Sequence, residues 1–168
     1  TGAVTAKKDC AAAICGRMDL GLAEGCEAYG SVESQSGDYV GGVAGICSAA
    51  IENCCAKCEL SGGRYLGGIV GSAWGDGIIR NCYNTGTIST TYTCPAGGIL
   101  GTNEGMDVYN CYNAGRIDTN GAQYGRGIGG HDSGSYTVSN CYYLSGCDDD
   151  AGANGYYKGT SRKISVSC

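Results

Sequence analysis

Four carboxylates stand in or near glycine-rich turns, where they could serve acid–base chemistry on a glycan. Retaining glycosidases use two carboxyl groups about 5 Å apart. One step of a parallel strand stack gives nearly that separation. Turns of an acidic protein carry such residues anyway, so we favour solvated turns and interpret the lone His131 in the same way. The four carboxylates belong to Asp76, Glu104, Asp107 and Asp132.

Three short motifs match patterns of binding or redox sites, but the residues around them do not support such a site. Residues 125–130 fit GxGxxG, but a dinucleotide site needs a helix afterwards, and residues 136–141 continue as a strand pattern. Cys55 and Cys58 form a CxxC without a second pair or a helix start, which favours a disulfide or a structural role. The three aspartates at 148–150 suit calcium or a charged stop to strand addition, and we favour the stop.

The composition restricts the class of protein. The 168 residues include 32 Gly, 13 Cys and 13 Tyr but no Phe, and the net charge is −5. An acidic chain without a basic stripe is not expected to bind nucleic acid, and no apolar run is long enough for membrane insertion. The chain opens on Thr1 without a secretory signal, so we expect a mature or excised segment.

A repeat runs through the chain. A glycine pair precedes an apolar residue at 41–43, 67–69 and 97–99, and a cysteine follows each about a dozen residues later. Successive cysteines are 28, 28, 29 and 30 residues apart, and an asparagine precedes each of the last four. The cysteines are Cys26, Cys54, Cys82, Cys111 and Cys141, and the asparagines are Asn53, Asn81, Asn110 and Asn140.

This period predicts a stack of coils. It is too short for a propeller blade, and neither helical heptads nor a leucine ladder accompanies it. We therefore predict an all-β fold, a right-handed parallel β-helix (β-solenoid) of about five coils with 28–30 residues per coil. Residues 13–146 would form the coils. Residues 1–12 and 147–168 would be caps or segments that join one subunit to the next.

Two apolar positions per coil predict where the chain bends. One follows the glycine pair. The other lies three residues before the cysteine, so strand alternation would place it and the cysteine on opposite faces. Both reach the core only if the chain turns near Asn81, and asparagine tolerates turn dihedrals. We expect the four asparagines to form a hydrogen-bonded ladder. The first apolar column would be Ile14, Val43, Ile69, Ile99 and Ile128, and the second Ile51, Ile79, Val108 and Val138.

The cysteine column has three interpretations. Buried thiols acting as small hydrophobic groups are favoured. Disulfides between adjacent coils fit the spacing, and a metal column is the third alternative. The cysteines outside the column are candidates for bridges, and Cys10 with Cys15 or Cys147 with Cys168 could pin the ends. We expect neither cofactor nor metal.

Tyrosines recur at two positions of the coil. If their rings face outward, either set makes a stripe suited to carbohydrate rings or protein partners, and otherwise they shield the strands. Trp74, the single tryptophan, is the best anchor candidate. The first set is Tyr39, Tyr65 and Tyr124, and the second is Tyr83, Tyr112 and Tyr142.

The repeat resembles the GLUG motif of bacterial surface proteins. The copy at residues 67–88 carries the resemblance through its glycine pair and its Asn-Cys-Tyr-Asn-Thr-Gly segment, and the copy at 97–117 matches as closely. The resemblance implies a β-solenoid of adhesin-like proteins, secreted or wall-attached, and transfers no catalytic residue.

Three functions remain open at this point. The first is a non-enzymatic extracellular module that binds a protein or glycan on a host or neighbouring cell. The second is a subunit that assembles end to end with copies of itself, because open strand edges favour such contacts. The third is a carbohydrate-active β-helix enzyme.

Overall fold

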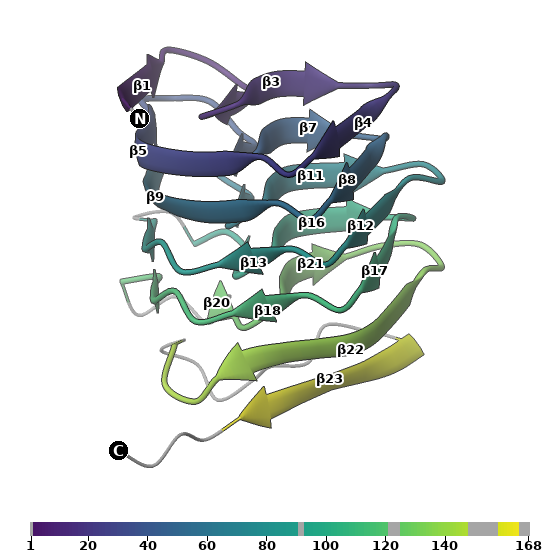
Figure 1. Cartoon of the computed structure of the whole chain (residues 1–168). Coiled ribbons are helices and arrows are strands. Elements are labelled where there is room, and N and C mark those ends of the chain that lie inside the picture. The colour runs from purple at the N-terminus through teal and green to yellow at the C-terminus, as the bar shows by residue number, and fades with distance from the viewer. Residues whose placement is uncertain (1, 91–92, 121–124, 148–157, 165–168) are drawn as a thin grey trace.

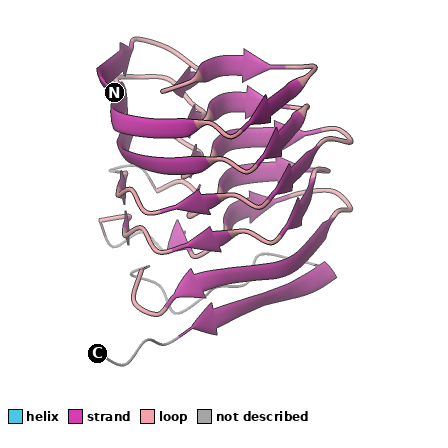
Figure 2. Ribbon diagram, in the orientation of Figure 1, coloured by secondary structure: helices cyan, strands magenta, loops and turns pink. Residues whose placement is uncertain are grey.

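The computed structural model describes residues 2–90, 93–120, 125–147 and 158–164, which form strands and turns and no helix. Parallel strands stack into five coils along one axis, with the N-terminus at one end and the last strand at the other (Figures 1 and 2). The prediction of an all-β parallel β-solenoid of about five coils is confirmed.

Each coil passes through three sheets. Sheet B has the order β2-β6-β10-β15-β20, sheet C has the order β3-β7-β11-β16-β21, and the 13-stranded sheet A is entered twice per coil. The first coil is β2 (Ala11–Ala12), β3 (Cys15–Met18), β4 (Leu22–Glu24) and β5 (Glu27–Ser34). The second is β6 (Val40–Gly41), β7 (Ala44–Cys47), β8 (Ala50–Glu52) and β9 (Cys55–Gly62).

The later coils divide the last part of the turn differently. The third coil is β10 (Leu66–Gly67), β11 (Val70–Trp74), β12 (Ile78–Arg80), β13 (Tyr83–Asn84) and β14 (Ile88–Ser89). The fourth is β15 (Ala96–Gly97), β16 (Leu100–Glu104), β17 (Asp107–Tyr109), β18 (Tyr112–Asn113) and β19 (Ile117–Asp118). The fifth is β20 (Gly125–Arg126), β21 (Gly129–Asp132) and β22 (Thr137–Leu144).

The core consists of stacked apolar columns, three of which follow directly from the repeat. Ile79 pairs with Ile51 in the coil before it and with Val108 in the coil after it, and all three side chains are fully buried. Ile69 belongs to the column predicted after the glycine pair, and Ile88 belongs to a third column after the cysteines. Because equivalent apolar residues lie one above another, each coil buries the core surface of its neighbour.

The glycines of the repeat are required by close backbone contacts. A Cβ on Gly67 would lie 1.9 Å from a carbonyl oxygen of its own coil, and one on Gly68 would lie 2.1 Å from the Gly98 oxygen of the next coil. A Cβ on Gly71 would lie 2.6 Å from the backbone of Tyr39 in the preceding coil. No larger side chain fits at these positions unless the coils separate.

The bend predicted near Asn81 is present. Asn81 has a φ of 56°, in the left-handed region that asparagine adopts more readily than most residues. The backbone reverses parity there, so the apolar residue of β12 and Cys82 both face the core.

The two ends of the chain extend the stack. β1 (Gly2–Ala6) pairs in parallel with β5, and β23 (Lys158–Ile164) pairs in parallel with β22. Ile14 lies above Val43 in the expected register, because Cys15 pairs with Ala44. Its side chain is 46 % exposed, however, so the first aliphatic column is open at this end.

Candidate functional site

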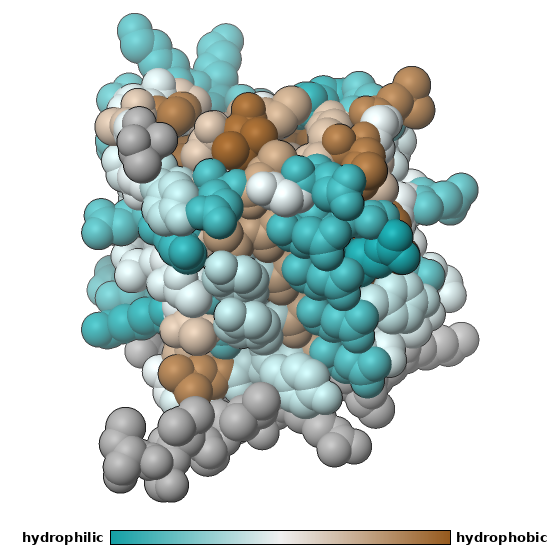
Figure 3. All heavy atoms as spheres, in the orientation of Figure 1, coloured by the Kyte–Doolittle hydropathy of each residue, from teal (hydrophilic) through white to brown (hydrophobic). Residues whose placement is uncertain are grey.

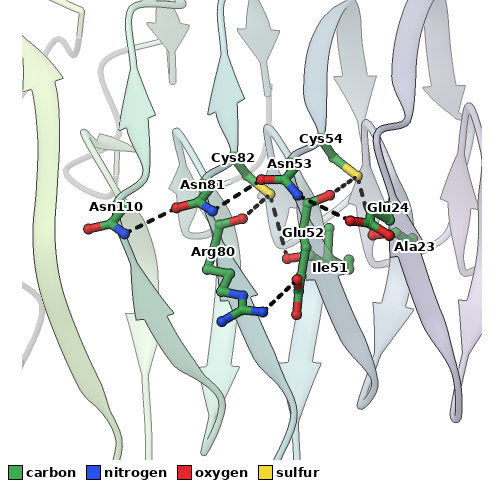
Figure 4. Close-up of polar contacts among 10 residues, drawn as sticks. All are labelled: Ala23, Glu24, Ile51, Glu52, Asn53, Cys54, Arg80, Asn81, Cys82 and Asn110. Carbon is green, nitrogen blue, oxygen red and sulfur yellow. Dashed lines mark hydrogen bonds and ion pairs between the residues drawn. The ribbon is translucent and has the colours of Figure 1, made fainter.

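The exposed asparagines form a hydrogen-bonded ladder along the axis (Figure 4). The Asn81 amide donates to Oδ1 of Asn53 at 3.1 Å, and the Asn110 amide donates to Oδ1 of Asn81 at 3.1 Å. The Asn140 amide continues the ladder to Asn110 at 3.3 Å. These side-chain hydrogen bonds connect successive coils at the corner where the backbone needs a residue with left-handed dihedrals.

The cysteine column lies directly inside this corner. Cys54, Cys82, Cys111 and Cys141 are fully buried free thiols, whereas Cys26 at the open end is partly exposed. Each buried thiol donates to the carbonyl two residues before it, as Cys82 does to Arg80 at 3.2 Å (Figure 4).

Hydrogen bonds between neighbouring thiols shift the pKa values of the column in opposite directions. The bond to the Cys82 thiol, together with burial, raises the pKa of Cys54, whereas bonds to Cys111 and Cys54 lower the pKa of Cys82. Outside the column, burial raises the pKa of Cys47 and of Cys58 to about 11. Since the thiolate is the reactive form, Cys47 and Cys58 act as small apolar groups rather than nucleophiles.

Six cysteines outside the column are also free thiols, namely Cys10, Cys15, Cys47, Cys55, Cys58 and Cys94. Cys55 and Cys58 of the CxxC are both buried in β9, with no helix beside them. Cys10 and Cys15 are free and partly exposed, and Cys147 is buried at the foot of the third apolar column. Cys168 and the aspartates at 148–150 lie outside the described residues.

Sequence reasoning missed a second, buried asparagine pair. Asn84 accepts from the Gly86 amide at 3.0 Å and donates to the Gly86 carbonyl at 3.1 Å, and it also donates to Oδ1 of Asn113 at 2.8 Å. Asn113 makes the same two bonds to Gly115. Both side chains are 1 % exposed and fully used by the fold. The spacing Asn-x-Gly after the Asn-Cys-Tyr segment was the signal.

The first tyrosine set stacks where it is described. The rings of Tyr39 and Tyr65 lie 5.5 Å apart at 14°, and both residues have positive φ. Burial raises the pKa of Tyr39, and the charges of Asp38 and Glu104 raise it further. Tyr124 lies outside the described residues. The half-buried pair therefore shields strands and also presents ring edges.

The second tyrosine set makes an exposed row on sheet A. The rings of Tyr83 and Tyr112 lie 5.0 Å apart and are nearly parallel, at 2°. Tyr142 pairs with Tyr112 in register, and both are exposed, at 36 % and 43 %. An open groove of about 490 Å³ lies between these two, and its remaining lining is Asn110, Cys111 and Asn140.

A lysine extends this row towards the first coil. The Lys57 ammonium lies 5.1 Å from the ring centroid of Tyr29 and 6.0 Å from that of Tyr83. It also donates to the Tyr29 hydroxyl at 3.3 Å. Cations favour the faces of aromatic rings, so the row joins aromatic, amide and cationic groups on one outer face.

Trp74 lies at the end of β11, apart from either tyrosine stack. It is 41 % exposed, and the Arg17 guanidinium stands 6.0 Å from its ring. Its register partner in the next coil is Glu104. The indole is available to a partner, and no described tyrosine is paired with it.

The acidic candidates do not stack on one another. Glu104 pairs with Trp74, Asp107 pairs with Ile78, and Asp132 pairs with Asn103, so none of these acids stands above another. Asp107 accepts from the Thr137 backbone amide at 2.7 Å and from the Tyr109 hydroxyl at 3.0 Å. Asp76 is exposed in the turn after β11, and His131 is exposed beside the half-buried Asp132.

The GxGxxG segment is a turn of the fifth coil. It spans β20 and the start of β21, and β22 follows it rather than a helix. A Cβ on Gly127 would lie 2.2 Å from the Tyr143 ring. The glycine there makes room for an aromatic ring of its own coil.

A polar groove that the sequence did not indicate follows the other end of sheet A. Its volume is about 540 Å³, and it crosses the first four coils. Carboxylates and hydroxyls line it in register, since Glu33 pairs with Ser61 and Ser89 pairs with Asp118.

Among the described residues, no group of three or more His, Cys, Asp or Glu side chains could hold a metal ion. No helix that could span a membrane was found among them either.

The fold and the repeat define a class, that of β-solenoid modules. A family model described as the GLUG motif matches residues 62–89, which contain the strands of the third coil. The chain is therefore a β-solenoid whose third coil carries the GLUG motif. No curated protein and no solved structure was found to match it.

Proposed function

We propose that this chain is a non-enzymatic structural and adhesive module of a bacterial surface protein, exposed outside the cell. The observation that carries the proposal is the row of Tyr83, Tyr112 and Tyr142 beside the asparagine ladder. Aromatic and amide groups repeat there at the step of the coils. Such surfaces suit glycans and protein partners, because rings provide contact area at low entropic cost and amides orient the ligand.

The interior supports the same proposal. The inward positions are filled mostly by apolar side chains and by buried thiols, of which Cys47 and Cys58 have raised pKa values. The buried amides of Asn84 and Asn113 are bound to their own turns. These interior groups stabilise the fold, and the outer faces are available to contact a ligand.

Adhesion of protein-coated beads tests the proposal. Fluorescent beads carrying the chain would be washed over surfaces coated with mucin glycoprotein, with deglycosylated mucin and with albumin. We expect retention that falls several-fold in a Tyr112→Ser, Tyr142→Ser double variant and not in the control Thr87→Ala, which alters an exposed residue of the third coil. Equal retention on all surfaces, or by both variants, would count against an adhesive role for this face.

A further inference from the structure

The exposed aliphatic side chains gather at the N-terminal end of the solenoid. Among the described residues, the large hydrophobic side chains with high exposure are three aromatic ones on the outer faces and four aliphatic ones at this end. Figure 3 shows hydrophobic surface along the end where β1, β3 and β4 lie in Figure 1. The four are Val4 at 37 %, Ile14 at 46 %, Leu20 at 89 % and Leu22 at 52 %.

The same end presents strand edges. β1, β2, β3 and β4 are each the terminal strand of their row, paired on one side only by β5, β6, β7 and β8. Exposed edges carry backbone donors and acceptors that pair with any strand of suitable direction. This end therefore offers hydrogen-bonding groups and apolar side chains together.

The end continues the interface that holds the coils together. Val4 lies above Val32 and Ala23 lies above Ile51, in register with the buried columns below. In the interior the same positions are covered by the next coil and are fully buried. The exposed end is thus one half of an inter-coil interface.

The opposite end differs. Ile128, Val138 and Cys141, the last members of their columns, are all at most 1 % exposed, and β23 pairs along β22. β20 and β21 are also terminal strands of their sheets, but a head-to-tail chain of subunits would have to join the exposed aliphatic side chains to an end whose last apolar side chains are already buried. Two copies that meet through their open ends would instead cover both apolar surfaces and close the assembly by two-fold symmetry.

The charges allow such a contact. Residues 2–26 contain three cations and three carboxylates, whereas the whole chain has a net charge of −5. Two copies of this end meet without net repulsion. The cations are Lys7, Lys8 and Arg17, and the carboxylates are Asp9, Asp19 and Glu24.

We propose that the N-terminal end, formed by β1, β3, β4 and the Leu20 turn, is the docking surface for the same end of a second copy. The product is a closed dimer in which both sets of open edges and aliphatic side chains are covered. This inference is independent of the adhesive role, because it uses a different face of the molecule.

Sedimentation velocity of the whole chain over a wide concentration series, with reductant to exclude intermolecular disulfides, tests the proposal. We expect a species of twice 17.0 kDa that dissociates on dilution. A Leu20→Asp, Leu22→Asp double variant should weaken the dimer about a hundredfold, because buried interface anchors dominate association. Both side chains are more than half exposed, so the fold should survive, with an unchanged circular dichroism spectrum as the check.

The control is a Tyr112→Asp, Tyr142→Asp double variant, which adds the same two charges at exposed aromatic residues of sheet A and should leave the dimer intact. Three outcomes would overturn the proposal. These are a monomer at every concentration, a dimer that persists in the double variant, and assemblies that grow without limit, which would mean head-to-tail contact.

Discussion

The first and third coils pass through the sheets in the same order, but their side chains have different surroundings. Ile69 of the third coil is fully buried, whereas its counterpart Ile14 is 46 % exposed. Cys82 is buried, whereas its counterpart Cys26 is partly exposed. The comparison shows that one repeat does not form a core. Burial comes from neighbours on both sides, as expected for a quasi-one-dimensional fold.

The largest expected effect is at an interior glycine. In Gly68→Ala the new Cβ would lie 2.1 Å from the Gly98 oxygen and against the Asn84 side chain. Because one obstacle is backbone, we expect a loss of more than about 4 kcal/mol and failure to fold at 37 °C. The control is Gly2→Ala at the open end, where nothing lies within 4 Å. Thermal melting by circular dichroism checks both, and a folded Gly68→Ala protein with an unchanged Tm would contradict the close packing.

Truncation of an aliphatic column should depend on the coil. Ile79→Ala leaves a cavity among fully buried side chains and should cost about 2–5 kcal/mol. Ile14→Ala removes a half-exposed side chain and should cost less than about 1 kcal/mol in the monomer. Urea unfolding of dilute protein measures both, and equal losses would mean that the first coil is covered after all.

The asparagine ladder should contribute less than the columns. Asn81→Ala removes two amide hydrogen bonds of 3.1 Å and places alanine at a φ of 56°. We expect a loss of about 1–2 kcal/mol, because exposed hydrogen bonds contribute modestly and alanine disfavours this region. Asn81→Gly tolerates the φ and should be less harmful. If Asn81→Gly were less stable than Asn81→Ala, the left-handed backbone would not be the cause of the stability loss.

The smallest effect concerns the fifth coil, where Asp132 occupies the position of Asn103. Asn103 is fully buried and accepts from the Gly105 and Met106 amides at 3.2 and 3.0 Å. The two carboxyl oxygens of Asp132 are buried and accept from no backbone amide in the described part of the chain, although the Tyr136 side chain interacts with the carboxyl group. Burial raises the pKa of Asp132, and neighbouring groups oppose the rise only in part.

A raised folded-state pKa means that the folded protein holds this proton more tightly than the unfolded chain does. The stabilisation is therefore complete below the unfolded pKa near 4 and is lost as pH rises through the folded value. We expect Asp132→Asn to raise stability at pH 7 by about 1 kcal/mol and to remove this part of the pH dependence. Melting of both proteins from pH 4 to pH 7 checks it. A variant that melts lower at pH 7 would show that the carboxylate is needed.

Much of the fold could be predicted from the sequence because the spacing of equivalent residues in the repeat gives the pairing register between successive coils. The spacing of Cys54 and Cys82 gives the coil length, and the opposite strand parity of the core-facing Ile79 and Cys82 requires the bend found at Asn81. The sequence left open whether the cysteines form disulfides, and those of the column and of the CxxC are free thiols.

The surroundings of individual side chains were harder to predict. Asn84 and Asn113 occupy the position that Ala28 and Ala56 have in the first two coils. A polar residue at a core position contradicts the apolar pattern unless its hydrogen-bond partners in the turn are known. Likewise, Ile14 has the right type for the core. Whether anything covers it depends on the neighbouring coil and not on its own repeat.

Hydrogen exchange of dilute, monomeric protein, measured by mass spectrometry on short peptides, tests the central claim most directly. The account predicts that amides of β11, β12, β16 and β17 exchange slowest and that those of β2, β3 and β4 exchange fastest, since local opening follows the number of covering coils. Equal protection of the first and interior coils, or the greatest protection in the first coil, would contradict a stack held by its neighbours and open at its N-terminal end.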